Sequence, residues 1–248
     1  AGIPYRVPDA PELPARLRGV LAVVYLVFNE GHTASAGEEL LRPELTGKAL
    51  RLGRLLRELL PDEEEVAGLL ALMLLVDSRR AARVDASGAV VRLADQDRGQ
   101  WHRTRIEEGQ ALLRECLARD RPGPYQLQAA INAVHADARD SRSTDWRQIL
   151  ALYDQLMALN PTPVVALNRA VVVAEVDGAE SALRLVEELD LPTYAWFHAV
   201  KADLLARLGR RESAITSLQT AIRYCANRRE REYLERRWAA LPEGAEAR

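Results

Sequence analysis

Two polar stretches in the first half of the sequence hold the side chains best placed to do chemistry. The string D-S-R-R at 77–80 follows a long apolar run and precedes Arg83, so we expect its charges to project from the core. The string D-Q-D-R at 95–98 comes shortly before Trp101 and supplies carboxylates to pair with those arginines. Buried charges need such partners, because an unpaired ion is costly to remove from water.

Polar residues also interrupt apolar segments of the second half. Gln128 and His135 lie on one predicted helix, and N-R at 168–169 breaks a later apolar run. Two interpretations remain open: a network of ion pairs and hydrogen bonds that fixes helix register, or a polar groove for a peptide or small ligand. The D-W pair at 145–146 is either a helix cap with a core anchor or the edge of a partner surface. The candidate interaction or pocket residues are Asn29, Glu30, Arg79, Arg80, Arg83, Asp95, Asp97, Trp101, Tyr125, Gln128, His135, Asp145, Trp146, Asn168 and Arg169.

No residue spacing in the sequence indicates catalysis or metal binding. The four histidines, at 32, 102, 135 and 198, lie far apart, with no H-E-x-x-H motif and no cysteine at ligand spacing. A G-x-S-x-G motif, a Walker phosphate loop and a dinucleotide fingerprint are also absent. The glutamates at 63–65 are better explained as anions at the positive end of a helix dipole. We therefore predict no catalytic residues, no metal, no cofactor and no enzymatic activity.

The composition is that of an ordinary globular protein. The 248 residues are 48% hydrophobic and 28% charged, with a formal net charge of -2 and an aromatic content of 5%. A slightly negative net charge does not attract a phosphate backbone, and so few aromatic rings leave little surface on which bases could stack. We therefore expect no direct nucleic-acid binding. Cys116 and Cys225 are separate thiols without a disulfide framework, which fits a cytoplasmic location. The most apolar run, 66–76, is too short to span a membrane, so we expect no membrane association.

The elements that would position these residues are helices. The run V-A-G-L-L-A-L-M-L-L-V at 66–76 is apolar on every side, so we predict it as the buried centre of one long helix over 62–83. A Ser-Gly turn between short apolar arms predicts one small β-hairpin near 83–93. Residues 1–12 are rich in proline and predict a stiff linker, followed by an N-terminal helical subdomain over 13–123. Its other helices are expected at 13–28, 43–60 and 98–119.

Residues 124–240 have the pattern of helix pairs followed by a capping helix, with a tail at 241–248. Ala170 and Ala182 recur as Ala202 and Ala214, and such small residues let two helices cross closely. This segment resembles the tetratricopeptide repeat, although the signature tryptophan is missing. The sequence predicts an all-α fold: a helical-hairpin, tetratricopeptide-like array with an N-terminal helical subdomain and one small β-hairpin. Array helices are expected at 125–137, 145–159, 163–176, 179–189, 193–208, 212–225 and 228–240.

Eight strings, spread in order over nearly the whole chain, resemble one family. They are I-P-Y-R-V-P, L-V-F-N-E-G, L-L-A-L-M-L-L, D-S-R-R-A-A-R, D-Q-D-R, G-P-Y-Q-L-Q-A-A-I, T-D-W-R-Q-I and P-V-V-A-L-N-R-A. The chain resembles the C-terminal extension of a group of extracytoplasmic-function sigma factors, the bacterial initiation factors with tetratricopeptide-like tails. In that family the regions that bind promoter DNA and RNA polymerase precede the extension. We therefore expect this chain, which begins without Met, to be part of a longer protein.

The resemblance implies a regulatory, protein-interaction domain that modulates promoter-directed transcription initiation. Its implied partners are the upstream sigma regions of the same chain and RNA polymerase, and a YCII-related protein, often encoded beside family members, is a further candidate. The residues themselves leave an alternative open: a small-molecule sensor with a polar pocket between helices. That pocket would be formed by Arg79, Arg80, Asp95, Asp97 and Gln128.

Overall fold

The computed structural model describes residues 12–241, and within this range the chain is helical, with no β-strand. Among these helices, none combines the length and apolar character that a membrane span requires. The predicted linker and tail fall almost wholly outside the described residues. The α-helices are α1 (Leu13–His32), α2 (Pro43–Leu59), α3 (Glu64–Asp77), α4 (Arg103–Leu117), α5 (Pro124–Asp137), α6 (Trp146–Leu159), α7 (Pro163–Val176), α8 (Ala179–Glu187), α9 (Ala195–Arg207), α10 (Arg211–Tyr224) and α11 (Arg228–Ala239).

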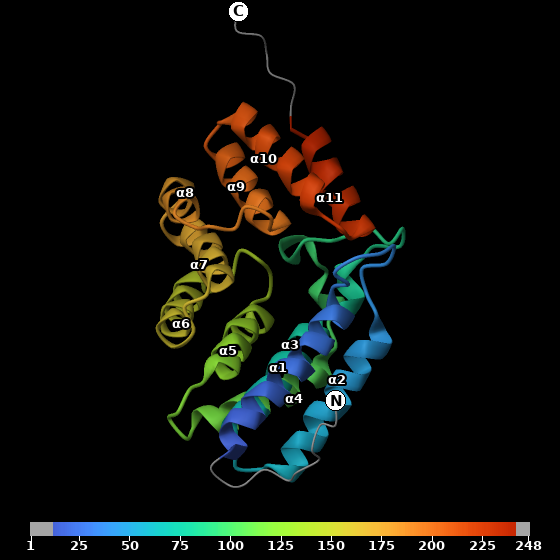
Figure 1. Ribbon diagram of the computed structural model, residues 1–248, viewed down its shortest axis with the longest axis vertical. Coiled ribbons are helices and arrows are strands. Elements are labelled where there is room, and N and C mark those ends of the chain that lie inside the picture. The colour runs from blue at the N-terminus through green and yellow to red at the C-terminus, as the bar shows by residue number, and fades with distance from the viewer. Residues whose placement is uncertain (1–11, 242–248) are drawn as a thin grey trace, which may run out of the picture.

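Helix α3 is the centre of the N-terminal unit, which comprises α1 to α4 (Figure 1). Its residues from Val66 to Leu75 are all buried, since the helix is apolar on every side and packs against α1, α2, α4 and α5. At its start, the carboxylate of Glu65 accepts backbone N–H bonds from Tyr125 (3.0 Å) and Gln126 (3.2 Å). This carboxylate caps the exposed N–H groups of α5 and so ties the array to the N-terminal unit.

The long helix predicted over 62–83 is wrong in its last six residues, because α3 ends at Asp77. The Asp77 carboxylate is fully buried and forms an ion pair with Arg105 of α4, with 2.5 Å between Nη1 and Oδ2. The Ser78 hydroxyl donates a hydrogen bond to a carbonyl of the last helical turn (2.7 Å). The carbonyl of Ser78 accepts the N–H of His102 (2.9 Å) instead of continuing the helical hydrogen bonds, so the chain turns here and continues as the 3-10 helix η2 (Arg80–Arg83).

The small β-hairpin predicted near 83–93 is not formed. Val84 and Val90 make one isolated antiparallel bridge, and no strand is present on either side of it. The carboxylate of Asp85 organises the turn by accepting two backbone N–H bonds, at 2.8 and 3.0 Å. The chain soon enters the 3-10 helix η3 (Leu93–Asp95), so the arms are too short to pair as strands.

The helix predicted over 98–119 starts later than expected, as α4. Residues Arg98–Gln100 form the 3-10 helix η4, which is capped by Asp97: its carboxylate accepts the N–H of Gly99 (2.9 Å). Because this cap completes a short turn of its own, the α-helix begins only after Trp101. The remaining predicted helices begin and end within a few residues of the observed bounds.

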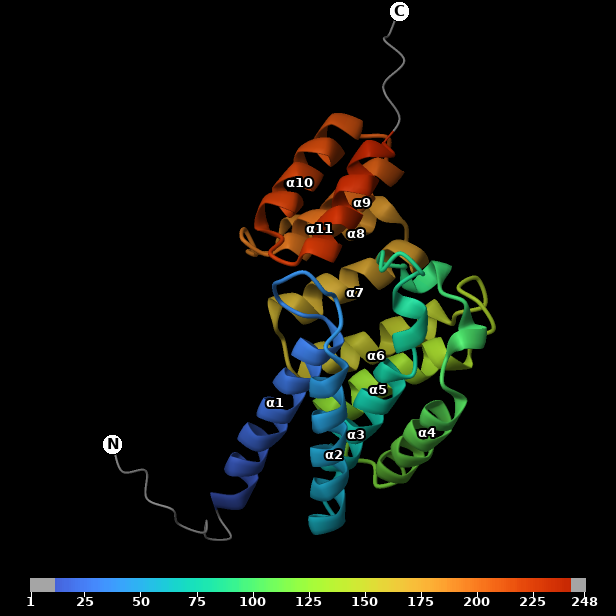
Figure 2. The same ribbon diagram turned by 90° about the vertical axis from the view of Figure 1, so that its right-hand side faces the viewer.

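Helices α5 to α10 form three antiparallel pairs, and α11 packs on the last of them. The four alanines that recur in the sequence, Ala170, Ala182, Ala202 and Ala214, are all buried. Their small side chains let neighbouring helices approach closely, as the repeat pattern predicts. The pairs follow a curved path, so that α11 returns to the vicinity of the N-terminal unit (Figures 1 and 2).

One buried asparagine joins the end of the array to the N-terminal unit. Asn227, the N-cap of α11, donates from Nδ2 to the carbonyls of Ala34 (3.1 Å) and Glu39 (3.0 Å) in the loop between α1 and α2. The backbone of Asn227 forms an isolated parallel bridge with Gly37 of the same loop. The chain is thus closed on itself, with the array bounded at both ends by the N-terminal unit.

Candidate interaction groove

A groove lies between the array and the segment of residues 92–98 that belongs to the N-terminal unit. It contains a cavity of about 360 Å³, a size within the range of ligand-binding pockets. Array residues on α5, α6, α7, α9 and α11 form one wall, and the 92–98 segment forms the other. The residues that line it are Arg92, Leu93, Ala94, Arg98, His135, Ser141, Thr144, Trp146, Tyr153, Asn168, Val171, Val172, Asp203, Arg207 and Arg237.

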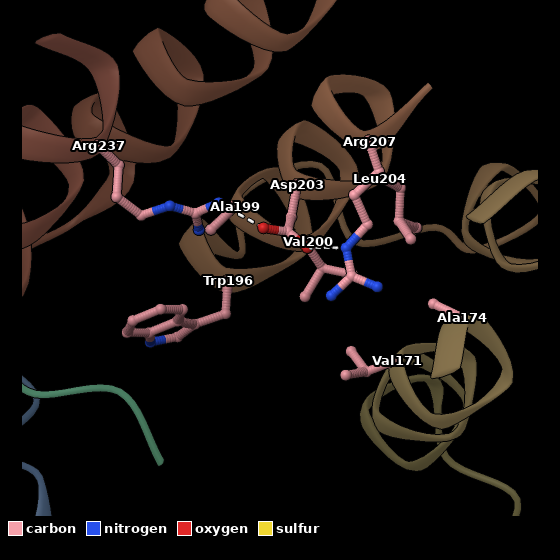
Figure 3. Close-up of a pocket in the computed structure, with 9 residues that line it drawn as sticks. All are labelled: Val171, Ala174, Trp196, Ala199, Val200, Asp203, Leu204, Arg207 and Arg237. Atoms are coloured by element: carbon pink, nitrogen blue, oxygen red, sulfur yellow. Dashed lines mark hydrogen bonds and ion pairs between the residues drawn. The ribbon is translucent and has the colours of Figure 1, made fainter. Parts of the chain in front are cut away.

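A second, smaller cavity of about 130 Å³ extends the groove between α7, α9 and α11 (Figure 3). Its apolar side chains include Val171, Trp196 and Val200, and it shares Val171, Asp203, Arg207 and Arg237 with the larger cavity. Trp196 and Val171 lie on opposite sides of the opening, as Figure 3 shows. The groove therefore has an arginine-rich part and an apolar part.

Asp203 lies between two arginines at the junction of these parts (Figure 3). Its Oδ1 is 2.6 Å from Nη2 of Arg237, and its Oδ2 is 3.0 Å from Nε of Arg207. Arg207 also pairs with Glu175, with 2.7 Å between Nη1 and Oε1. The arginines are thus held in place by carboxylates on α7 and α9, which positions their remaining N–H groups along the groove.

At the other end of the groove, Arg98 and Arg79 lie close to the indole ring of Trp101. The Cζ atoms are 4.8 Å (Arg98) and 5.9 Å (Arg79) from the ring centroid, which is cation–π distance. Arg98 donates from Nη1 to the carbonyls of His135 and Ala138 at the end of α5. Burial, together with the charge of Arg98, lowers the pKa of Arg79 to about 10. Burial and both arginines lower the pKa of His135 to about 4, so His135 is neutral at pH 7.

The structure places three of the sequence-predicted residues in the groove lining: His135, Trp146 and Asn168. The rings of His135 and Trp146 meet edge to face, with 5.5 Å between centroids. Arg79 and Trp101 lie directly behind the lining, where Arg79 donates from Nη2 to the Asn132 side chain (3.2 Å). Arg79 and Trp101 thus come from the N-terminal unit, and the three lining residues come from α5, α6 and α7.

The predicted pairing of the carboxylates at 95–98 with Arg79 and Arg80 is wrong. Asp95 pairs with Arg92, three residues before it, with 2.6 Å between Nε and Oδ2. The carboxylate of Asp97 caps η4, as described above. Arg80 forms an ion pair with the buried carboxylate of Asp77. Asp95 and its partner Arg92 lie three residues apart on one short turn, so this ion pair needs no particular packing of distant segments.

The pocket predicted from Arg79, Arg80, Asp95, Asp97 and Gln128 is also not present in that form, since none of these residues lines either cavity of the groove. Gln128 accepts the hydroxyl of Tyr25 (3.2 Å) in the contact between α1 and α5. This polar interaction fixes helix packing, in agreement with the network interpretation of these stretches.

The remaining predicted residues lie elsewhere in the structure. Arg83 donates to His32 O and to the hydroxyl of Thr33 at the end of α1. The other five have local or packing roles. Glu30 pairs with Arg42, the exposed Asn29 accepts the N–H of Thr33, Tyr125 packs on Tyr25, Asp145 caps α6 and Arg169 pairs with Asp154.

Six charged or aromatic residues of the groove were not singled out from the sequence: Arg92, Tyr153, Trp196, Asp203, Arg207 and Arg237. Charged residues on amphipathic helices are usually solvated, so their types carry no signal by themselves. The spacing of two of these residues along their helix does carry a sequence signal. Asp203 and Arg207 are four residues apart on the face of α9 that the repeat pattern turns toward α7.

In the described part of the chain, no group of three or more His, Cys, Asp or Glu side chains could hold a metal ion. The thiols of Cys116 and Cys225 are both buried, and burial raises the pKa of each to about 11. A thiol with such a pKa is protonated at neutral pH and is therefore a poor nucleophile.

Comparison with known proteins gives the following similarities. Residues 16–117 match the model of a family of unknown function (DUF6596), a range that runs from α1 to the end of α4. An uncharacterized protein of Rhizobium meliloti is 47% identical over 236 residues, which are 94% of this chain and 56% of that protein. The chain thus spans little more than half the length of this curated relative.

A solved structure has a similar fold. The crystal structure of a thermophilic TPR protein from Thermus thermophilus aligns with 90% of this chain and 97% of that chain, with a TM-score of 0.55 and 16% sequence identity. TPR stands for tetratricopeptide repeat. At this identity the match shows the fold alone, and it agrees with an all-helical, tetratricopeptide-like array.

Proposed function

We propose that this chain is the regulatory, protein-interaction domain of a bacterial extracytoplasmic-function sigma factor, and that it modulates promoter-directed transcription initiation by RNA polymerase. The observation that carries the proposal is the groove. Stacked helix pairs present an extended inner surface, and proteins of this architecture use that surface to bind partners. In this chain the surface holds a cavity with ordered arginines and half-buried aromatic rings rather than a flat, solvated face.

Two further observations support a role inside a larger protein. The eight strings that resemble sigma-factor extensions extend from the first residues of the chain into α7. The relative from Rhizobium meliloti is longer than this chain, since the match covers 56% of it and leaves 44% outside. A sigma factor with an appended regulatory domain has this kind of organisation.

In the proposed mechanism, the N-terminal unit orients the groove against the sigma regions. The capping of α5 by Glu65 and the contact of Asn227 with the α1–α2 loop hold the unit and the array together at two separate points. A partner bound in the groove is therefore held at a defined angle to α1. The partners in this proposal are the sigma regions of the same chain and RNA polymerase, and a YCII-related protein is a further candidate to be tested by co-purification.

The test is transcription in vitro from a target promoter, with the full-length parent and a version cut before Ala1. Higher activity of the truncated factor would identify the domain as a restraint on initiation. Lost activity, with the sigma regions still folded, would identify it as required. Equal activity at all promoters tested would refute a direct regulatory role.

A second candidate function is small-molecule sensing, and the volume of the cavity favours it. About 360 Å³ is enough for a metabolite-sized ligand. A ligand that binds only the folded chain raises its melting temperature by mass action. A metabolite library that leaves the melting temperature of the wild type unchanged would exclude this function for the compounds screened.

A further inference from the structure

The arginines of the groove outnumber the carboxylates that neutralise them. Four arginines line the larger cavity, and Asp203 is the one carboxylate in that lining. Two carboxylates just outside the cavity contribute as well: Asp95 pairs with Arg92, and Glu175 pairs with Arg207. Even with both counted, the lining has one more positive than negative charge.

Arg98 accounts for the excess. It forms no ion pair with any described carboxylate and donates instead to backbone carbonyls of α5. Burial lowers its pKa, while the charge of Asp140 acts on it in the opposite direction without direct contact. Arg79, directly behind it, is partly buried and likewise has no carboxylate partner in the described part of the chain. Two neighbouring cations without counter-ions make this end of the groove favourable for an anion.

The apolar end of the groove is suited to a hydrophobic side chain. Its cavity of about 130 Å³ is close to the roughly 150 Å³ of an engineered protein cavity that binds benzene. Val171 and Trp196 flank it, and Arg237 and Asp203 separate it from the arginine-rich end (Figure 3). A ligand that used both ends would need carboxylates at one end and an apolar group at the other.

We propose that the groove binds an acidic peptide segment of a partner protein. Its carboxylates contact the N–H groups of Arg92, Arg98 and Arg207, and one apolar side chain enters the space between Val171 and Trp196. A peptide fits better than nucleic acid, because Asp203 lies midway along the path where a phosphate backbone would have to pass. The inference rests on the proposed function and adds the chemistry of the partner.

The experiment uses the whole 248-residue chain and does not depend on transcription. Random peptides displayed on phage are selected against the wild-type chain, and the strongest binder is synthesised with a fluorescent label. We expect the selected peptides to be enriched in Asp and Glu with a nearby apolar residue. Binding measured by fluorescence anisotropy should weaken when salt is raised to about 0.5 M, since screening reduces attraction between charges at the surface. Replacing the Asp and Glu of the peptide by Asn and Gln should weaken it about tenfold or more.

The groove variant is Arg92→Gln/Arg207→Gln, because both side chains are about half exposed (55% and 45%) and their loss leaves the core intact. The matched control is Arg54→Gln/Arg210→Gln. It removes the same charge from two arginines that pair with glutamates outside the groove. We expect about tenfold weaker binding for the groove variant and an unchanged affinity for the control.

Three outcomes would overturn the inference. In the first, the selected peptides are not enriched in acidic residues. In the second, both double variants bind the peptide equally weakly. In the third, the chain without peptide is a dimer joined through the groove, and the peptide dissociates this dimer. None of these would decide whether the domain regulates a sigma factor, which only the transcription assay tests.

Discussion

Glu230 on α11 provides a pH-dependent contribution to stability whose sign and size follow from its surroundings. Its carboxyl lies between the array and the N-terminal unit, facing Arg83 of η2, Trp196 of α9 and the thiol of Cys225, which is 4.0 Å from Oε2. Burial raises the pKa of Glu230 to about 7, and the charge of Arg83 and the hydrogen bond to Trp196 counteract this only in part. The folded protein therefore holds a proton on Glu230 more tightly than the unfolded chain does.

The magnitude follows from the two pKa values. A rise from 4.5 to about 7 is a shift of roughly 2.5, and each pKa unit corresponds to about 1.4 kcal/mol, so the full effect is about 3 kcal/mol. Because the folded-state pKa is raised, this stability is present below about pH 4.5 and is lost as the pH rises through about 7. The substitution Glu230→Gln keeps the shape of the protonated form and removes the titration.

The assay is urea denaturation of the wild type and of Glu230→Gln at about pH 5 and about pH 8. We expect the wild type to lose about 2.5 kcal/mol more than the variant between these values, somewhat less than the full effect, because the unfolded chain is already mostly ionised at about pH 5. The change in the free energy of unfolding between the two pH values has to be compared in both proteins, because burial also raises the pKa of Glu65, which titrates in each of them. Glu232→Gln on the same helix is the control. Arg228 lowers the pKa of Glu232, so this carboxyl is ionised in the folded and the unfolded chain over most of this pH range, and its replacement should leave the pH dependence almost unchanged. Parallel pH profiles of the wild type and Glu230→Gln would refute this reasoning.

Three other substitutions test the packing that positions the groove, each by urea denaturation. Gly68→Ala should destabilise the fold by about 1–3 kcal/mol, because an added Cβ would lie 2.9 Å from the backbone nitrogen of Gln126 on α5. The control is Gly47→Ala, where an added Cβ would have no neighbouring atom within 4 Å, and this substitution should be neutral or stabilising. Leu72→Ala in the fully buried centre of α3 should cost about 2–5 kcal/mol, and a cost below about 1 kcal/mol would argue against its central place. Asn227→Ala removes an N-cap and leaves two loop carbonyls unpaired, so about 2–4 kcal/mol should be lost; an unchanged midpoint would show that the contact with the α1–α2 loop is not formed.

The position of α3 was predictable because its sequence leaves no alternative. A segment that is apolar on every face, and too short for a membrane, has to be surrounded by other helices. Its end was not predictable from the same argument. The arginines after Asp77 look like a continuation of the helix with a favourable dipole, whereas the hydrogen bond from His102, at the start of α4, to the carbonyl of Ser78 ends it. That hydrogen bond depends on where α4 packs, which no local pattern reports.

The residues of the groove were likewise predictable from the sequence only in part. His135, Trp146 and Asn168 were recognisable because polar or aromatic groups stand out within apolar helices. Asp203 and Arg237, 34 residues apart, stand out in neither helix and acquire their role only when α9 and α11 pack together. Their 2.6 Å contact results from the way the helices of the array pack, so the repeat pattern was the useful sequence signal for this part of the groove.

Helix α11 links the closure of the chain to the width of the groove. Asn227 at its N-terminus is bound to the α1–α2 loop, Glu230 in its first turn faces η2, and Arg237 two turns later lines both cavities. A rigid helix that is displaced at one end moves at the other, so loosening Asn227 should shift Arg237 relative to Asp203. We therefore expect Asn227→Ala to weaken binding of the selected acidic peptide although residue 227 lines neither cavity. An unchanged affinity in a variant that is still folded would mean that the groove is held by the array alone.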